Sequence, residues 1–234
     1  MWLNRKFQNK ARISFLHIAS GVTETDTTNR LRFRQTSGLH GEFKHDGFKG
    51  KADVYYQYGK SGDASNVSAF LADADLSYNY QQLTFGAGYS YLSGNRNVNS
   101  SKDKLFDVLY GARHRFLGHM DYFGSLDAST KEGGIVDGRI YLAVKPFDNV
   151  QLQYTGHYFR LAERNANTPQ NKNLGVENEL ELRYKFNSWG SLKAAYLFYL
   201  PTQTFETIQG VENSKFAQFA FIELTINPRL FIQQ

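Results

Sequence analysis

Apolar and charged side chains alternate along much of this chain with a period of two residues. The alternation is clearest from Leu174 to Phe186, where the even positions are apolar except for Asn178. The odd positions of the same stretch carry Glu177, Glu179, Glu181, Arg183 and Lys185. A helix would scatter both sets around its axis, whereas an extended strand places alternate residues on opposite faces. The pattern therefore predicts a strand with one apolar face and one charged face.

The same alternation recurs along the chain and predicts about eleven strands. They are expected at residues 12–19, 30–44, 48–58, 72–80, 83–91, 113–123, 137–145, 150–158, 174–186, 191–200 and 220–226. Most of them reach about ten residues, the length that a tilted strand needs to cross a bilayer. Strands of soluble domains are usually about five or six residues long.

The expected connections between these strands alternate between short and long. Short turns are expected at residues 46–47, 80–82, 147–149 and 187–190. Longer connections, rich in Asn, Ser, Thr, Gly and Asp, are expected at 21–29, 60–66, 94–104, 127–134, 163–172 and 202–214. We interpret the longer ones as solvated loops. Short turns on one side and long loops on the other are typical of bacterial outer-membrane barrels.

A soluble β-sandwich would show the same alternation, with its apolar faces packed between two sheets. Three features favour a barrel instead: long strands, consecutive hairpins, and aromatic residues near the strand ends. Phe, Tyr and Trp make up 15% of the chain, and such rings are enriched where a membrane meets water. We therefore expect an all-β protein, an antiparallel up-and-down transmembrane β-barrel that forms a single domain over residues 1–234.

Composition narrows the possible functions further. The chain has no cysteine, which excludes disulfides, thiol nucleophiles and thiolate metal sites. Its formal charge is +5, but acidic residues are interleaved with basic ones, so we expect no nucleic-acid partner. The start of the chain, Met1 to Lys6, lacks the apolar region and the cleavage site of a signal peptide.

The charged faces of the expected strands supply the candidate solute-binding residues. Arg30, Arg32 and Arg34 are spaced by two, so three guanidinium groups would follow one face and bind successive carboxylates. The expected lumen bases are Arg30, Arg32, Arg34, Lys49, Lys51, Arg113, Arg115, Arg139, Arg183 and Lys185, and the expected lumen acids are Asp73, Asp75, Glu177, Glu179 and Glu181. Two interpretations stay open. The bases contact a solute, or they pair with the acids and hold the shape of the barrel.

Candidate catalytic and metal sites are weak in this sequence. His114, His119 and Asp121 match no spacing of metal ligands, and we interpret them as polar residues of a loop or lumen. Asp73 and Asp75 would share a strand face, where we expect them to face Lys and Arg and not to form a catalytic pair. We therefore expect no enzyme, no metal and no cofactor. A barrel enzyme remains the alternative from that class.

Several stretches resemble the alginate-export family of outer-membrane porins, especially the versions from Bacteroidetes-type bacteria. The stretches are residues 2–7, 11–16, 33–36, 52–59, 88–94 and 106–123, so the resemblance covers nearly the whole chain. It implies a monomeric barrel in the bacterial outer membrane, in contact with lipid, with an electropositive pore that passes an anionic polysaccharide or another anionic solute. A structural or adhesive barrel with a plugged lumen is the alternative.

Two features depart from that family. Its members are much longer and carry a signal peptide, and this chain resembles only their C-terminal part. The resemblance therefore implies an N-terminally truncated piece that forms part of a larger barrel or a shorter barrel of its own. The final Gln233 and Gln234 also replace the terminal aromatic residue typical of such barrels, although Phe231 lies close by.

Overall fold

The computed structural model describes residues 1–8, 10–23, 31–97, 100–109, 117–213 and 216–228. Within them the chain forms one twelve-stranded sheet and two short helices. The strands are β1 (Trp2–Phe7), β2 (Ala11–Thr23), β3 (Leu31–His45), β4 (Phe48–Lys60), β5 (Asn66–Tyr80), β6 (Leu83–Leu92), β7 (Lys102–Asp103), β8 (Ile135–Phe147), β9 (Val150–Leu161), β10 (Asn173–Lys185), β11 (Gly190–Pro201) and β12 (Ala217–Ile226). The helices are α1 (Leu126–Thr130) and α2 (Gln203–Gln209). Neither of these described helices is long and apolar enough to cross a membrane.

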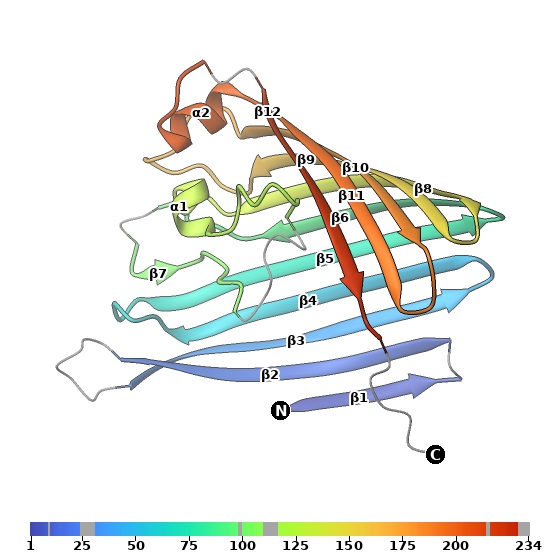
Figure 1. The fold of residues 1–234 in the computed structure, drawn as a ribbon. Helices are drawn as coiled ribbons and strands as arrows, with labels where there is room; N and C mark the ends of the chain where they lie inside the picture. The colour runs from blue at the N-terminus through green and yellow to red at the C-terminus, as the bar shows by residue number, and fades with distance from the viewer. Residues whose placement is uncertain (9, 24–30, 98–99, 110–116, 214–215, 229–234) are drawn as a thin grey trace.

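Each long strand pairs with its neighbours in the sequence, so the sheet has an up-and-down order. From β1 to β12 these pairs are all antiparallel, and only the two-residue β7 lies off the path, parallel to β5. The sheet curls so that β12 crosses in front of the concave face (Figure 1). This topology confirms the predicted all-β antiparallel fold. Among the described residues no pairing joins β1 to β12, so the sheet is curled but not closed.

The turns confirm the predicted asymmetry between the two ends of the sheet. The long connections gather at one end of the strands and the short turns at the other (Figure 1). Asp46 and Gly47 join β3 to β4 and both have positive φ, of 45° and 85°. Two such residues form the type I′ turn whose twist matches that of antiparallel strands. The hairpin is therefore fixed by its local sequence.

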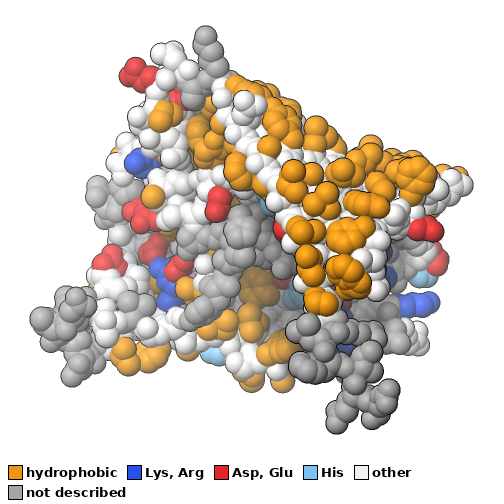
Figure 2. All heavy atoms as spheres, in the orientation of Figure 1, with side chains coloured by type: hydrophobic (Ala, Val, Ile, Leu, Met, Phe, Trp, Pro, Cys, Tyr) orange, Lys and Arg blue, Asp and Glu red, His pale blue; other side chains and the backbone are white. Residues whose placement is uncertain are grey.

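The two faces of the strands differ as the alternation predicts. On β10, Leu180 is 48% exposed whereas Glu177 is fully buried on the opposite face. Exposed apolar side chains recur at every second position of the other long strands, and Figure 2 shows them gathered over β10 to β12. An apolar outer surface on a sheet whose inner surface is charged is the pattern of strands that face lipid.

Polar side chains on the outer face are matched by tyrosine hydroxyl groups on neighbouring strands. Asn178, the one exception to the apolar row of β10, accepts a hydrogen bond of 2.7 Å from the hydroxyl of Tyr154 on β9. The hydroxyl of Tyr196 donates to Gln218 on β12 in the same way, at 2.8 Å. Because an unsatisfied polar group in an apolar environment is costly, these tyrosines let polar residues remain on the lipid-facing side.

The connection between β6 and β8 folds back onto the concave face, which the sequence did not predict. We call its described parts, residues 100–109 and 117–134, the inner segment. The strand predicted at 113–123 is wrong for residues 117–123, which form turns, and residues 113–116 lie outside the described residues. The solvated loop predicted at 127–134 is also wrong in part, because Ser129 and Thr130 are buried.

Hydrophobic residues of the inner segment join a core inside the curled sheet. Phe106, Leu117, Phe123 and Leu126 pack with side chains from the strands and from α2. The strand and helix members are Val67, Ala69, Leu92, Ile135, Phe159, Leu161, Leu174, Tyr199, Phe205 and Ile208. Most of the strand members lie near the long connections, so this core occupies that end of the concave face.

The tyrosine at position 154 provides a test of the lipid-facing arrangement. Replacing Tyr154 with Phe removes the donor to Asn178, and we expect it to lower the free energy of unfolding by about 1–3 kcal/mol. The measurement is urea unfolding of the protein in lipid vesicles. The double change Tyr154→Phe with Asn178→Leu should recover most of the loss. A loss no greater than that of Tyr158→Phe, an outward tyrosine on the same strand, would contradict this role.

Candidate functional site

The predicted lumen residues that the structure describes lie on the concave side of the sheet. Arg30, Arg113 and Arg115 fall outside the described residues. The other predicted lumen residues lie at the same alternate positions of their strands as the buried core residues. They are Arg32, Arg34, Lys49, Lys51, Asp73, Asp75, Arg139, Glu177, Glu179, Glu181, Arg183 and Lys185. Their placement on one face follows from the two-residue period, because cross-strand partners share a face.

Arg139 on β8 is the centre of the largest group of charges. Its guanidinium nitrogens lie 3.0 Å from Asp73, 3.4 Å from Asp75 and 3.6 Å from Asp137, and one of them donates to Ser90 at 2.7 Å. Its side chain is only 11% exposed. A guanidinium group with five donors suits such a site, since it bonds several acceptors at once. Asp73 and Asp75 thus share a cation.

The charges continue on both sides of Arg139. Towards β4, the ammonium group of Lys51 lies 3.7 Å from Asp73. Towards β10, His157 lies 3.0 Å from Asp137 and 3.8 Å from Glu179. Glu179 in turn lies 3.0 Å from the imidazole of His119, which belongs to the inner segment. Opposite charges therefore alternate across the wall from β4 to β10.

A second group of charges occupies β2 to β4. Arg12 bonds Glu42, and His40 lies 3.7 Å from Glu42 and 2.8 Å from Asp53. We call the two groups together the ionic belt; its members are Arg12, His40, Glu42, Lys51, Asp53, Asp73, Asp75, His119, Asp137, Arg139, His157 and Glu179. Charges with low exposure are stable only when they are paired. The belt therefore explains how the barrel interior accommodates several carboxylates.

Of the predicted arginine ladder, Arg34 on β3 pairs with an acid, which is one of the two interpretations that the sequence left open. Arg34 lies 2.6 Å from Asp103 of the inner segment and also donates to Gln57. This guanidinium thus binds a carboxylate of the chain itself. Pairing is the interpretation that the described contacts of Arg34 and Arg139 favour, and contact of the other bases with a solute remains a prediction.

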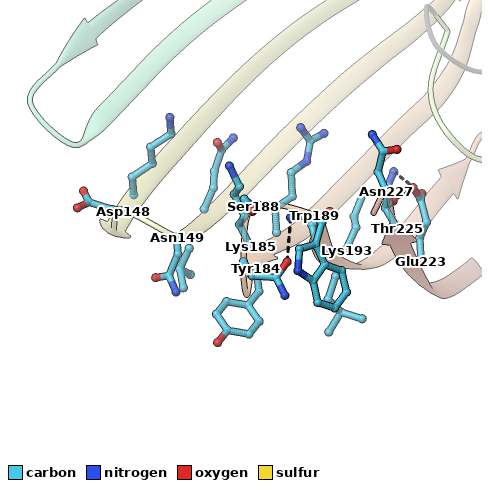
Figure 3. A pocket seen from close by; sticks show the side chains of 18 residues that line it. Asp148, Asn149, Tyr184, Lys185, Ser188, Trp189, Lys193, Glu223, Thr225 and Asn227 are labelled. Carbon is cyan, nitrogen blue, oxygen red and sulfur yellow. Dashed lines mark hydrogen bonds and ion pairs between the residues drawn. The ribbon is translucent and has the colours of Figure 1, made fainter. Parts of the chain in front are cut away.

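Basic side chains gather at the other end of the concave face, beside the short turns. Lys145, Arg183, Lys185 and Lys193 line a hollow of about 600 Å³, and we call these four residues the basic rim. Asp148 and Glu223 are the acidic residues of the same hollow, so cations are in excess. Figure 3 shows Lys185 and Lys193 on either side of the turn that carries Trp189. Arg183 is 56% exposed, so its guanidinium is accessible.

Acidic residues gather at the opposite end, beside the long connections. A hollow of about 470 Å³ is lined by Asp63, Asp103, Asp107, Asp127 and Glu132. Arg34 and Lys102 are its basic residues. We call it the acidic hollow. The linings of these two hollows thus carry an excess of opposite charge.

The histidines do not form a metal site in the described part of the chain. No group of three His, Asp or Glu side chains there has the geometry to hold a metal ion. His119 bonds Glu179 through Nδ1, and His114 lies outside the described residues.

Sequence reasoning missed several members of the site. His40, Asp53, Asp137 and His157 lie at inward positions of predicted strands, so the alternation was sufficient to place them on the charged face. Lys145 and Lys193 were likewise visible as charged positions. Their grouping depends on how the sheet curls and on a bulge of β8 between Val144 and Phe147, which the sequence does not show.

Arg139 allows a test of the ionic belt. Because Arg139→Met would leave three carboxylates with less compensation in a site of low exposure, we expect a loss of about 3–5 kcal/mol in unfolding free energy. The exposed Arg183 provides the matched control, since Arg183→Met should cost about 0–1 kcal/mol. Urea unfolding in vesicles measures both. Equal costs for the two variants would show that the belt is not needed for stability.

His119 predicts a pH dependence in the inner segment. Its hydrogen bond to Glu179 raises the pKa of the imidazole, and partial burial opposes this rise. Glu181 adds to the rise, while Lys193 on β11 acts against it. A raised pKa means that protonated His119 stabilises the folded segment fully below about pH 6.5, the ordinary value, and that this stabilisation is lost as the pH rises through the higher folded value.

Hydrogen exchange measures this effect. After correction for intrinsic rates, amides of residues 119–130 should be better protected near pH 6 than near pH 9. His119→Gln should remove most of the difference. A difference of the same size in the Gln variant would assign the pH dependence to another group.

Comparison with solved structures places the fold among outer-membrane proteins. OccK10 (OpdN) of Pseudomonas aeruginosa is similar with a TM-score of 0.60 and 13% identity, over 98% of this chain and 59% of that one. OmpTdeltaL8, a loop deletion mutant of an outer membrane protein of Vibrio cholerae, is similar with a TM-score of 0.51 and 11% identity, over 96% and 61%. The chain thus spans about three fifths of each of these proteins. At such identities the likeness concerns the fold.

Comparison of the sequence with protein families gives a more specific result. The model of the alginate export family matches residues 3–183. A search of curated proteins gave no match. Since the family match covers most of the chain and the fold agrees with it, the chain belongs to the alginate export family and is a β-barrel protein of the bacterial outer membrane.

Proposed function

We propose that this barrel is a passive channel through which an anionic solute crosses the outer membrane. The observation that carries the proposal is the basic rim at the short-turn end of the concave face. Four cationic side chains surround an open hollow there, against two acidic ones. Rings of like charge at a pore mouth concentrate ions of opposite charge and exclude ions of the same charge. The family match, named for alginate export, is consistent with a solute that carries carboxylates.

The arrangement of the rim suits weak and repeated binding. Lys193 lies 3.3 Å from Glu223 and 3.8 Å from Glu181, so its charge is shared with acids of the wall. Arg183 likewise bonds Glu181. Conduction requires that a solute binds strongly enough to enter and weakly enough to leave. Interleaved acids provide this balance because they compete with the solute. Transport of this kind needs no catalytic residue and no second subunit.

The chemical partner that suits the rim is a polymer or small molecule with carboxylate groups. Trp189 lies in the turn beside the rim, with 46% of its surface exposed. An exposed aromatic ring near cations offers an apolar face and charge at one place, which suits a sugar ring that bears a carboxylate. An acidic polysaccharide is thus the solute class that we propose.

A plugged structural barrel is a second candidate, because the inner segment fills part of the concavity. Its core residues pack on the strands at the long-connection end. A barrel closed in this way would bind through its loops and would pass no current. Planar bilayer recordings of the full chain separate the two functions, since a channel gives discrete current steps and a plugged barrel gives none.

Charge reversal at the rim tests the solute preference. Arg183→Glu combined with Lys185→Glu should lower the ratio of anion to cation permeability several-fold, because two attractive charges become repulsive. The measurement is the reversal potential in a salt gradient. The matched control is Lys60→Glu with Arg164→Glu, which makes the same change of net charge at the end with the long connections. A shift as large in the control would count against the rim as the selective element.

A further inference from the structure

The two described parts of the inner segment contact different walls of the curled sheet. At one side, Arg34 on β3 binds Asp103, and Gln57 on β4 exchanges hydrogen bonds with the backbone of Asp107, at 2.9 and 2.7 Å. At the other side, residues 119 and 120 contact β10. The sheet order separates β4 from β10 by four long strands. The two described parts of the segment are therefore held at different places on the concave face, beside the space that a solute would cross.

The contact with β10 is made by two buried carboxylates. Glu179 accepts hydrogen bonds from the backbone N–H of His119, at 2.9 Å, and from its imidazole, at 3.0 Å. Glu177 accepts one from the backbone N–H of Met120, at 2.9 Å. Glu177 is fully buried and Glu179 is 9% exposed. Bonds from N–H groups to a carboxylate are stronger than bonds between neutral groups, so this contact is firm.

The backbone of the segment is shaped to fit these carboxylates. Gly118 has a φ of +82°, a conformation that L side chains rarely adopt. A Cβ atom at this position would lie only 2.6 to 2.8 Å from the carboxylate atoms of Glu177. Glycine is therefore favoured here by the backbone conformation, and any side chain at this position would also displace the Glu177 carboxylate or the segment.

Aromatic side chains seat the segment beside this contact. The ring of Phe123 lies 4.6 Å from that of Phe159 on β9, and the ring of Tyr122 lies 4.8 Å from that of Tyr199 on β11. Such packing is non-directional, whereas the carboxylate bonds fix one position of the backbone. The aromatic contacts hold the segment near the wall, and the bonds to the carboxylates fix its exact position on the wall.

We infer that Glu177 and Glu179 are positioning residues that hold residues 117–130 against β9 to β11 and thereby set the width of the passage. The inference rests on the proposed channel function and adds a determinant of solute size to it. Loss of both carboxylates leaves the backbone N–H groups of His119 and Met120 without acceptors in a partly buried place, which favours displacement of the segment towards water in the lumen. The passage then changes its cross-section while the strands remain paired.

The test compares variants of the full chain in two measurements. In the double variant Glu177→Met with Glu179→Met, the amides of Gly124 and Ser129 should exchange with solvent about tenfold faster. These amides donate to the carbonyl groups of Asp121 and Ser125, so the substitutions do not remove their acceptors. Their protection therefore reports how firmly the segment is held against the wall. Single-channel current should change in the same variant, and the cut-off for neutral sugars should move with it. Glu177→Gln with Glu179→Gln keeps acceptor oxygens and should restore most of both properties.

Two further variants separate positioning from folding. Gly118→Ala keeps both carboxylates in the sequence but strains the backbone and crowds the contact with Glu177, so it should change both measurements in the same direction as the Met variant. Gln153→Met replaces another inward polar residue, on β9, and serves as the control that should change neither measurement. Slow exchange of the β4 and β5 amides in every variant would show that the barrel is intact.

Each outcome decides the inference. Faster exchange together with altered current and size cut-off supports it. Unchanged exchange of residues 121–130 in the Met variant overturns it, and so does faster exchange with unchanged current. If the unaltered protein gives no current steps, the proposed channel function fails, and the exchange data alone then show whether the carboxylates hold the segment.

Discussion

The whole structure depends on satisfying backbone hydrogen bonds where water is scarce. In a bilayer every N–H and C=O group must find a partner within the protein, which leaves a continuous antiparallel ladder as the available arrangement for strands. Eleven strands in sequential order supply that ladder here. Once it exists, the two-residue period separates lipid-facing from inward-facing side chains, and every charged feature of the molecule follows from this separation.

The fold was predictable because its main signal is local. Alternation such as that of residues 174–186 predicts both the strand and its faces, and Asp46 with Gly47 predicts the hairpin by its conformational preferences. Two strands and both helices were missed for a physical reason. β1 and β7 are short, and the positions of α1 and α2 depend on packing with distant residues such as Phe159, which no local pattern contains.

The site was predictable only as a set of inward positions. The sequence placed Arg139, Asp73 and Glu179 on the charged face, but it did not show which partners they have, because these come from strands up to 66 residues away. The contrast between Arg34 and Arg183 illustrates the point. Both alternate with apolar residues, yet one binds the inner segment and the other stays exposed in the basic rim. Only the curl of the sheet and the path of the inner segment distinguish them.

The opposite charge of the basic rim and the acidic hollow affects the direction in which ions pass through the proposed channel. The basic rim lies beside the short turns and the acidic hollow beside the long connections. A pore with a fixed charge of one sign at one mouth and of the other sign at the second mouth behaves as an ionic diode, because counter-ions accumulate for one polarity and are depleted for the other. In the proposed channel, rectification of the current–voltage curve is the expected result of this placement of a few carboxylates and ammonium groups.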